Sequence, residues 1–92
     1  MPPRIKEDVE TSNITENIYN KFVILFNDNV NSFEHVEQCL MNICKKNKAE
    51  AESIAWEAHS NGKAECYRGS IEACEHVAEK MGQEQLTVEI QS

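Results

Sequence analysis

The sequence has few basic residues and is too short for a second domain. Nine Lys and Arg stand against sixteen Asp and Glu, which gives a net charge of -7. This charge opposes binding to phosphate backbones and to anionic membranes, so we expect no nucleic-acid or membrane partner and favour cationic partners. A chain of 92 residues forms one small core, and we expect its functional site in a surface groove.

Membrane and targeting signals are also missing from the sequence. No stretch approaches the roughly 18–20 apolar residues that span a membrane. The first eight residues, MPPRIKED, lack the apolar core of a signal peptide. We therefore expect a cytoplasmic protein.

The cysteines lack the spacing of a zinc or redox motif. None of the four belongs to a C-x-x-C pair: they are Cys39, Cys44, Cys66 and Cys74. We identify no histidine at a ligand spacing from them, so the sequence predicts no metal site and no cofactor. Reduced thiols that pack as small apolar side chains are the favoured interpretation.

Hydrophobic patterning predicts three strands after an N-terminal extension. Residues 1–20 are polar, contain both prolines and show no sustained period, which predicts a flexible extension. The apolar run over residues 21–26 predicts a buried strand, and the alternation over residues 86–90 predicts a strand with one exposed face. Residues 63–67 are predicted as a short strand or an extended connector.

Three helices are predicted between these strands from N-cap residues and apolar spacing. The first two starts combine an Asn with a Glu three residues later, which is the pattern of a capping box. The predicted helices run from the Asn31 cap to about Cys44, from the Asn47 cap to Gly62, and from the Ser70 cap to Gly82. The order β-α-α-β-α-β predicts an α+β fold over residues 21–92, with a small three-stranded mixed or antiparallel sheet packed against three helices.

Three polar features lie at the ends of these predicted elements. Asn27 and Asp28 directly follow a buried strand, His59 lies near the end of the second helix, and Lys63 follows its closing glycine. Taken singly, each has an ordinary structural explanation as a turn, a helix-end partner or a solvated side chain.

The same features in this order resemble the ClpS family, the adaptor of the Clp AAA+ protease. The resembling stretches are residues 23–36 (VILFNDNVNSFEHV), residues 59–66 (HSNGKAEC) and residues 70–74 (SIEAC). The resemblance covers roughly residues 21–92, with strands and helices where the patterning already predicts them.

The resemblance implies an adaptor rather than an enzyme. Such an adaptor recognises N-degron substrates, which carry a free α-amino group and a bulky hydrophobic first residue, and delivers them to the N-terminal domain of a Clp AAA+ ATPase. The residues implied for α-amino binding are Asn27, Asp28 and His59. They suit the task, because an ammonium group has three N–H donors and needs acceptors with negative charge nearby.

The resemblance also implies a hydrophobic pocket for the first side chain and a docking residue for the ATPase. The implied pocket residues are Asn31, Phe33, Val36, Ala55, Ala58 and Leu86, and the implied docking residue is Glu72. Phe33 stands where the family usually has Met, as a bulky gate against β-branched first residues. Trp56 lies off the apolar stripe of its helix, and we assign it no function.

Two other classes of function remain as alternatives. One is an interaction domain without N-terminal residue recognition, like the similarly folded domain of the ribosomal stalk protein, which would not need Asn27, Asp28 and His59 to converge. The other is a thiol enzyme that uses Cys66 or Cys74 with His59 or His76. The spacing of Cys74 and His76, two apart on a helix, argues against the enzyme because such residues face different sides.

Overall fold

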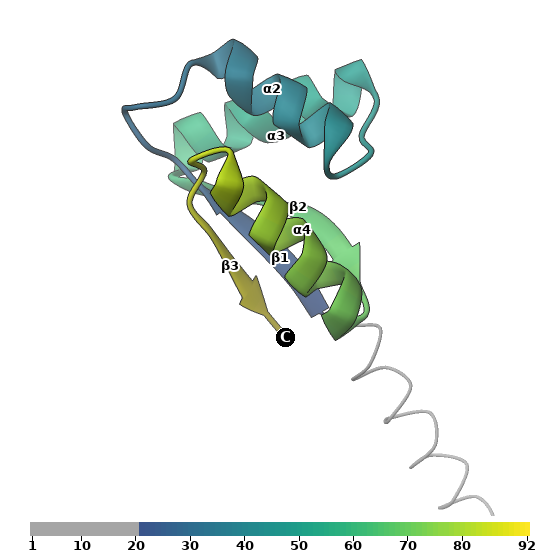
Figure 1. Cartoon of the computed structure of the whole chain (residues 1–92). Coiled ribbons are helices and arrows are strands. Elements are labelled where there is room, and N and C mark those ends of the chain that lie inside the picture. Colours follow the sequence, from purple (N-terminus) through teal and green to yellow (C-terminus); the bar gives the residue numbers. More distant parts are fainter. Residues whose placement is uncertain (1–20) are drawn as a thin grey trace, which may run out of the picture.

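The computed structural model of the chain describes residues 21–92, so the extension predicted over residues 1–20 lies outside the described residues. The elements are β1 (Lys21–Phe26), α2 (Phe33–Asn42), α3 (Lys48–Asn61), β2 (Lys63–Gly69), α4 (Ile71–Gln83) and β3 (Val88–Gln91) (Figure 1). This order confirms the predicted α+β fold.

The sheet has the strand order β2-β1-β3, and β1 pairs antiparallel with both neighbours. The sheet is therefore purely antiparallel. As the central strand, β1 is the most deeply buried: Val23, Ile24 and Leu25 are all buried, as the unbroken apolar run predicts. Its first residue, Lys21, pairs with Gly69 at the end of β2, and its last, Phe26, pairs with Lys63 at the start of β2.

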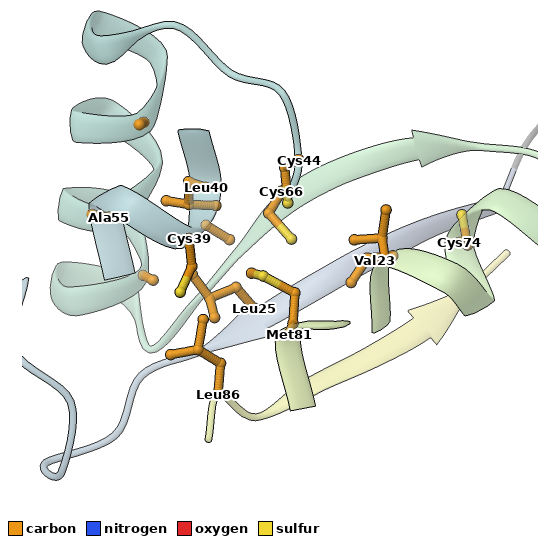
Figure 2. Packing of buried hydrophobic residues seen from close by; sticks show 14 residues of the cluster. Val23, Leu25, Cys39, Leu40, Cys44, Ala55, Cys66, Cys74, Met81 and Leu86 are labelled. Atoms are coloured by element: carbon orange, nitrogen blue, oxygen red, sulfur yellow. The ribbon is translucent and has the colours of Figure 1, made fainter. Parts of the chain in front are cut away.

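The helices divide into one that covers the sheet and two that pack at its end. α4 lies along the sheet and contacts all three strands, whereas α3 contacts β2 and carries α2 against its other side (Figure 1). Small side chains on α3, including Ala51, Ala55 and Ala58, are buried there, and small residues let helices approach closely. Leu25, Leu40 and Met81 fill the centre of the resulting core (Figure 2).

The ends of α3 follow the sequence prediction. Asn47 accepts from the Glu50 backbone N–H at 2.8 Å, while the Glu50 carboxylate accepts from the Asn47 N–H at 3.1 Å, which completes a capping box. At the other end Gly62 has φ 90°, the left-handed conformation that closes a helix.

The predicted start of α2 is wrong by one residue. Ser32, not Asn31, caps the helix, and its hydroxyl accepts from the His35 N–H at 3.1 Å. The Asn31 amide donates instead to Asp28 and to the Gln85 carbonyl, a tertiary partner that local sequence does not reveal. α2 also ends earlier than predicted, at Asn42.

The predicted end of α4 at Gly82 is also wrong. α4 continues to Gln83, and its closing left-handed residue is Gln85, with φ 70°. The Gln85 N–H donates to the Gly82 carbonyl and the Leu86 N–H donates to the Met81 carbonyl, the two hydrogen bonds of a Schellman motif. This motif turns Leu86 into the core, and β3 begins only at Val88.

All four cysteines are free and buried, in agreement with their interpretation as small apolar residues. Among residues 21–92, none of the helices has both the length and the apolar character that a membrane crossing requires.

Candidate ligand-binding site

A cavity of about 490 Å³ opens between the end of β1, the loop that follows it, the start of α2 and the end of α3. Its wall includes the three residues that the family resemblance implies for α-amino binding: Asn27, Asp28 and His59. It also includes five of the six assigned to a hydrophobic pocket: Asn31, Phe33, Val36, Ala55 and Ala58. The volume lies within the range of about 300–1,000 Å³ found for small-ligand sites.

Leu86 is the one assigned pocket residue that does not line this cavity. Its side chain is 5% exposed and belongs to the main core cluster, as the end of the Schellman motif requires. Four lining residues were not predicted from the sequence: Leu25, Phe26, Asn29 and Trp56.

A backbone contact brings the loop after β1 to the end of α3. The Asn27 N–H donates to the Gly62 carbonyl at 2.9 Å, and the Gly62 N–H donates to the Ala58 carbonyl at 2.9 Å. His59 follows Ala58 directly and is exposed at the last turn of α3. The glycine that closes the helix therefore places the imidazole beside the same loop that carries Asn27 and Asp28.

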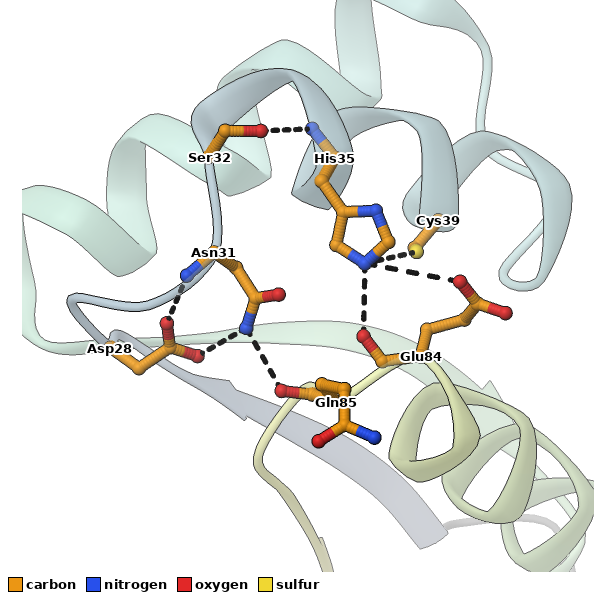
Figure 3. A network of polar contacts seen from close by, with 7 residues as sticks. All are labelled: Asp28, Asn31, Ser32, His35, Cys39, Glu84 and Gln85. Carbon is orange, nitrogen blue, oxygen red and sulfur yellow. Dashed lines mark hydrogen bonds and ion pairs between the residues drawn. The ribbon is translucent and has the colours of Figure 1, made fainter.

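The Asp28 carboxylate organises this loop. One oxygen accepts from the backbone N–H groups of Val30 and Asn31 at 2.9 and 2.8 Å, and the other accepts from Asn31 Nδ2 at 2.9 Å (Figure 3). These hydrogen bonds, led by the one from the Asn31 backbone, hold the pKa of Asp28 below its usual value. A carboxylate has about four acceptor sites, so Asp28 keeps its negative charge and about one free acceptor site.

The loop is also tied to the end of α4. Asn31 Nδ2 donates to the Gln85 carbonyl at 2.9 Å, and His35 Nε2 lies 2.9 Å from the Glu84 carbonyl oxygen (Figure 3). Asn31, which the sequence assigned to helix capping and to the pocket, therefore connects the cavity wall to the turn between α4 and β3.

Three rings form one side of the cavity. The Phe33 and Trp56 ring centroids lie 5.0 Å apart with planes tilted by 51°, and the Trp56 and His59 centroids lie 5.8 Å apart in an edge-to-face arrangement. Trp56 is 55% exposed, so its ring stands at the rim. Its three-residue spacing from His59 on a helix is the signal that could have identified it.

Glu72 lies away from this cavity. It is exposed in the first turn of α4, a helix that begins two residues after Gly69. Because Gly69 pairs with Lys21, the start of α4 and the loop after β1 lie at opposite ends of β1 (Figure 1). That loop lines the cavity, so Glu72 lies far from it.

The pairs required by a thiol enzyme do not form among the described residues. Cys66 and Cys74 are fully buried, whereas His59 and His76 are exposed. Burial raises the pKa of Cys74, which keeps the thiol protonated and unreactive. The Cys–His contact that does form is a different one, between Cys39 and His35.

The fold and the cavity define a small α+β domain whose apolar recess is rimmed by amide, carboxylate and imidazole groups. The sequence model of the family described as "ATP-dependent Clp protease adaptor protein ClpS" matches residues 18–89, most of the chain. The chain therefore belongs to the ClpS family, a family of adaptors rather than enzymes, and the resemblance inferred from the sequence is confirmed.

Among solved structures, the fold is similar to Agrobacterium tumefaciens ClpS2, which was determined bound to L-phenylalaninamide. The two share 22% sequence identity with a TM-score of 0.72, over 79% of this chain and 95% of the other. No curated protein matches the chain.

Proposed function

We propose that this protein is an adaptor that binds N-degron substrates through their free α-amino group and bulky hydrophobic first side chain, and delivers them to a Clp AAA+ ATPase. The observation that carries the proposal is the composition of one cavity wall, which has Asn27, Asp28 and His59 at the rim and apolar side chains below them. The A. tumefaciens relative, whose bound phenylalaninamide combines a primary amine with an aromatic side chain, supports it.

The rim has the groups that an ammonium ion requires. The α-ammonium group offers three N–H donors and a positive charge. Asp28 contributes the negative charge and its remaining acceptor site, Asn27 contributes an amide oxygen, and His59 contributes a ring nitrogen. Hydrogen bonds between charged partners contribute about 1.5–3 kcal/mol each, so the rim distinguishes a free amino terminus from a blocked one.

The recess has the character that a hydrophobic first side chain requires. Val36, Ala55 and Ala58 line it, and the two alanines are nearly fully buried while filling little space. Burial of a Leu or Phe side chain there contributes about 1.5–3 kcal/mol before ordering costs. An interaction domain without ligand recognition, the alternative considered from the sequence, needs no such recess.

Fluorescence anisotropy with a labelled peptide tests the proposal. A peptide that begins with a free Phe or Leu should bind with a dissociation constant of about 1 μM or lower, and the N-acetylated peptide should not bind measurably. Equal affinities of the two peptides would falsify the receptor function.

Matched variants locate the binding site. Asp28→Ala and His59→Ala should each weaken binding of the free peptide by about tenfold or more. His76→Ala is the control, because His76 is also an exposed histidine but lies on α4, outside the cavity wall. A loss of binding with His76→Ala equal to that with His59→Ala would place the site elsewhere.

We further propose that the partner is the N-terminal domain of the ATPase and that Glu72 belongs to the docking surface. Glu72 is exposed, negatively charged and remote from the cavity, so it is accessible to a second protein while a peptide is bound.

A further inference from the structure

A cluster of three potential metal ligands lies where α2 meets the end of α4. His35 and Cys39 are one helical turn apart on α2, and Glu84 is the C-terminal cap of α4. His35 Nε2 lies 3.7 Å from Cys39 Sγ and 3.9 Å from Glu84 Oε1 (Figure 3). The three ligand atoms all lie within 4.8 Å of one another. The sequence expectation that no histidine stands at a ligand spacing from a cysteine is therefore wrong for this pair.

Two of the three ligand separations, those from His35 Nε2, are close to those of a tetrahedral zinc site. Zinc binds His nitrogen at about 2.0–2.1 Å, Cys sulfur at about 2.3 Å and carboxylate oxygen at about 2.0–2.2 Å, which places neighbouring ligand atoms about 3.3–3.6 Å apart. The observed 3.7 and 3.9 Å exceed these values by only a few tenths of an ångström. The side chain of Glu84 is 51% exposed, so it has the freedom to close that gap.

More polar groups surround His35 Nε2 than one ring nitrogen can hydrogen-bond at once. Its three neighbours are the Glu84 carbonyl oxygen at 2.9 Å, the Glu84 carboxylate and the Cys39 sulfur. One ring nitrogen carries at most one proton, so the imidazole makes one good hydrogen bond and leaves the other two neighbours with a distant contact. A cation placed between the ring, the sulfur and the carboxylate would contact all three.

We propose that His35, Cys39 and Glu84 bind one Zn²⁺ ion, which joins α2 to the end of α4. Cys39 releases its thiol proton to solvent on binding, and His35 binds through Nε2 with its remaining ring proton on Nδ1. Thiolate and carboxylate together carry two negative charges, which neutralise the ion. Water occupies the fourth position, because the side chains of His35 and Glu84 are 35% and 51% exposed.

The choice of zinc follows from the mixture of ligand atoms. Magnesium and calcium prefer oxygen ligands alone, whereas zinc accepts nitrogen, sulfur and oxygen in tetrahedral geometry. Cys39 is 5% exposed, so its sulfur is largely shielded from solvent while it contacts His35.

Titration of the full-length, reduced, metal-free protein with Co²⁺ tests the site, because a cobalt–thiolate bond gives a charge-transfer absorption band. We expect one saturable equivalent of Co²⁺ with this band, and displacement of the cobalt by Zn²⁺ with loss of the band. Absence of the band at saturating Co²⁺ would overturn the proposal and leave the three residues as a metal-free hydrogen-bond network.

Variants assign the ligands. Cys39→Ser should abolish the band, and Glu84→Gln and His35→Gln should each lower the affinity for Zn²⁺ by at least about tenfold, measured by competition with a metal indicator. Glu79→Gln and His76→Gln, two exposed residues of α4, are the matched controls and should leave affinity unchanged.

Two checks distinguish a variant that has lost metal binding from one that has failed to fold. Cys39 is buried, so circular dichroism checks that Cys39→Ser is folded, while Glu84→Gln alters an exposed side chain and tests the site independently. Equal Zn²⁺ affinities of Glu84→Gln and Glu79→Gln would contradict the assigned ligands. None of these measurements uses a peptide, so their outcome is independent of whether the proposed adaptor function is correct.

Discussion

Asp28 has a double role in the loop after β1. Its carboxylate accepts three hydrogen bonds from the loop itself and also lines the cavity. Because its pKa is lowered, the carboxylate is charged throughout the neutral range. The negative charge that the proposed ligand requires is therefore present before the ligand arrives.

The pH dependence of peptide binding follows from this charge. A free peptide ammonium has a pKa of about 7.7–8.0, and contact with the Asp28 carboxylate raises that pKa in the complex. Affinity should therefore be highest below about pH 7.7 and should fall by up to about tenfold per pH unit above it, until the pH passes the raised value. Anisotropy titrations from about pH 6 to about pH 10 measure this, and an affinity that rises with pH would contradict it.

The stability of the folded protein at acid pH tests the ionisation of the Asp28 carboxyl group itself. A carboxyl group with a lowered pKa in the folded chain stabilises it fully above the unfolded value of about 3.9, and loses that contribution as the pH falls through the lowered value. The loop should therefore survive down to about pH 4, and Asp28→Asn should remove the contribution of this carboxyl group to the loss of stability at acid pH.

Phe33 gives the recess its expected selectivity. Its ring lines the cavity and packs against Trp56, which holds it at the entrance. We expect peptides that begin with Val or Ile to bind poorly and Phe33→Ala to strengthen their binding by about tenfold, since the substitution makes room for a β-branched side chain. Phe22→Ala, on β1 outside the cavity wall, is the control. Tight binding of Val peptides to the unaltered protein would contradict the hypothesis that Phe33 excludes β-branched first residues.

At the residue scale, the sequence predicted best where a side chain acts on its own neighbours. Asn27, Asp28 and His59 were assigned from the family resemblance, and all three line one cavity because a backbone contact joins the loop after β1 to the end of α3. Leu86 packs in the core and does not line the cavity, because its direction depends on the left-handed Gln85 before it. A non-glycine residue in that conformation gives no signal in the sequence.

At the element scale, α3 and α4 are each closed by a left-handed residue, and only one of these two residues is glycine. α3 ends at Gly62 with φ 90°, and α4 is closed by Gln85 with φ 70°. A Cβ atom added to Gly62 would meet no heavy atom from other parts of the chain within 4 Å, so its substitution acts mainly on the backbone conformational energy.

These two helix ends predict stability changes of opposite sign. Gly62→Ala should lower the free energy of unfolding by about 1 kcal/mol, because alanine is strained in this conformation. Gln85→Gly should raise the free energy of unfolding by about 0.5–1 kcal/mol, because it relieves the same strain. Urea denaturation measures both changes. A loss of stability with Gln85→Gly would show that the Gln85 side chain stabilises the fold by more than its left-handed backbone conformation costs.

The existence and order of the elements were predictable, and their ends were less so. An unbroken apolar run, an alternating run and three helical stripes each report directly on burial. The cap of α2 was assigned to Asn31 instead of Ser32 because the Asn31 side chain binds Gln85, which lies 54 positions later in the chain. Contacts of that range are absent from local patterns.

At the scale of the whole molecule, the cavity and Glu72 are separated by the length of β1. A strand of six residues spans about 20 Å. Sites at that distance without shared partners act independently, so binding of a peptide and docking of an ATPase should not interfere with each other.

Charge reversal at Glu72 tests this separation. Glu72→Lys should leave peptide affinity unchanged within about twofold and should weaken binding to the N-terminal domain of the ATPase, measured by anisotropy and by calorimetry. Glu79→Lys, an exposed glutamate further along α4, is the matched control. Equal effects of the two reversals on ATPase binding would place docking outside the first turn of α4.

The central position of β1 also has a consequence during translation. β1 leaves the ribosome before either of its neighbours, and its second neighbour, the four-residue β3, is made last. Until then one edge of an apolar strand has unpaired backbone groups, a state that favours association with other chains. The nascent protein should therefore be most dependent on chaperones in the interval between synthesis of β2 and synthesis of β3.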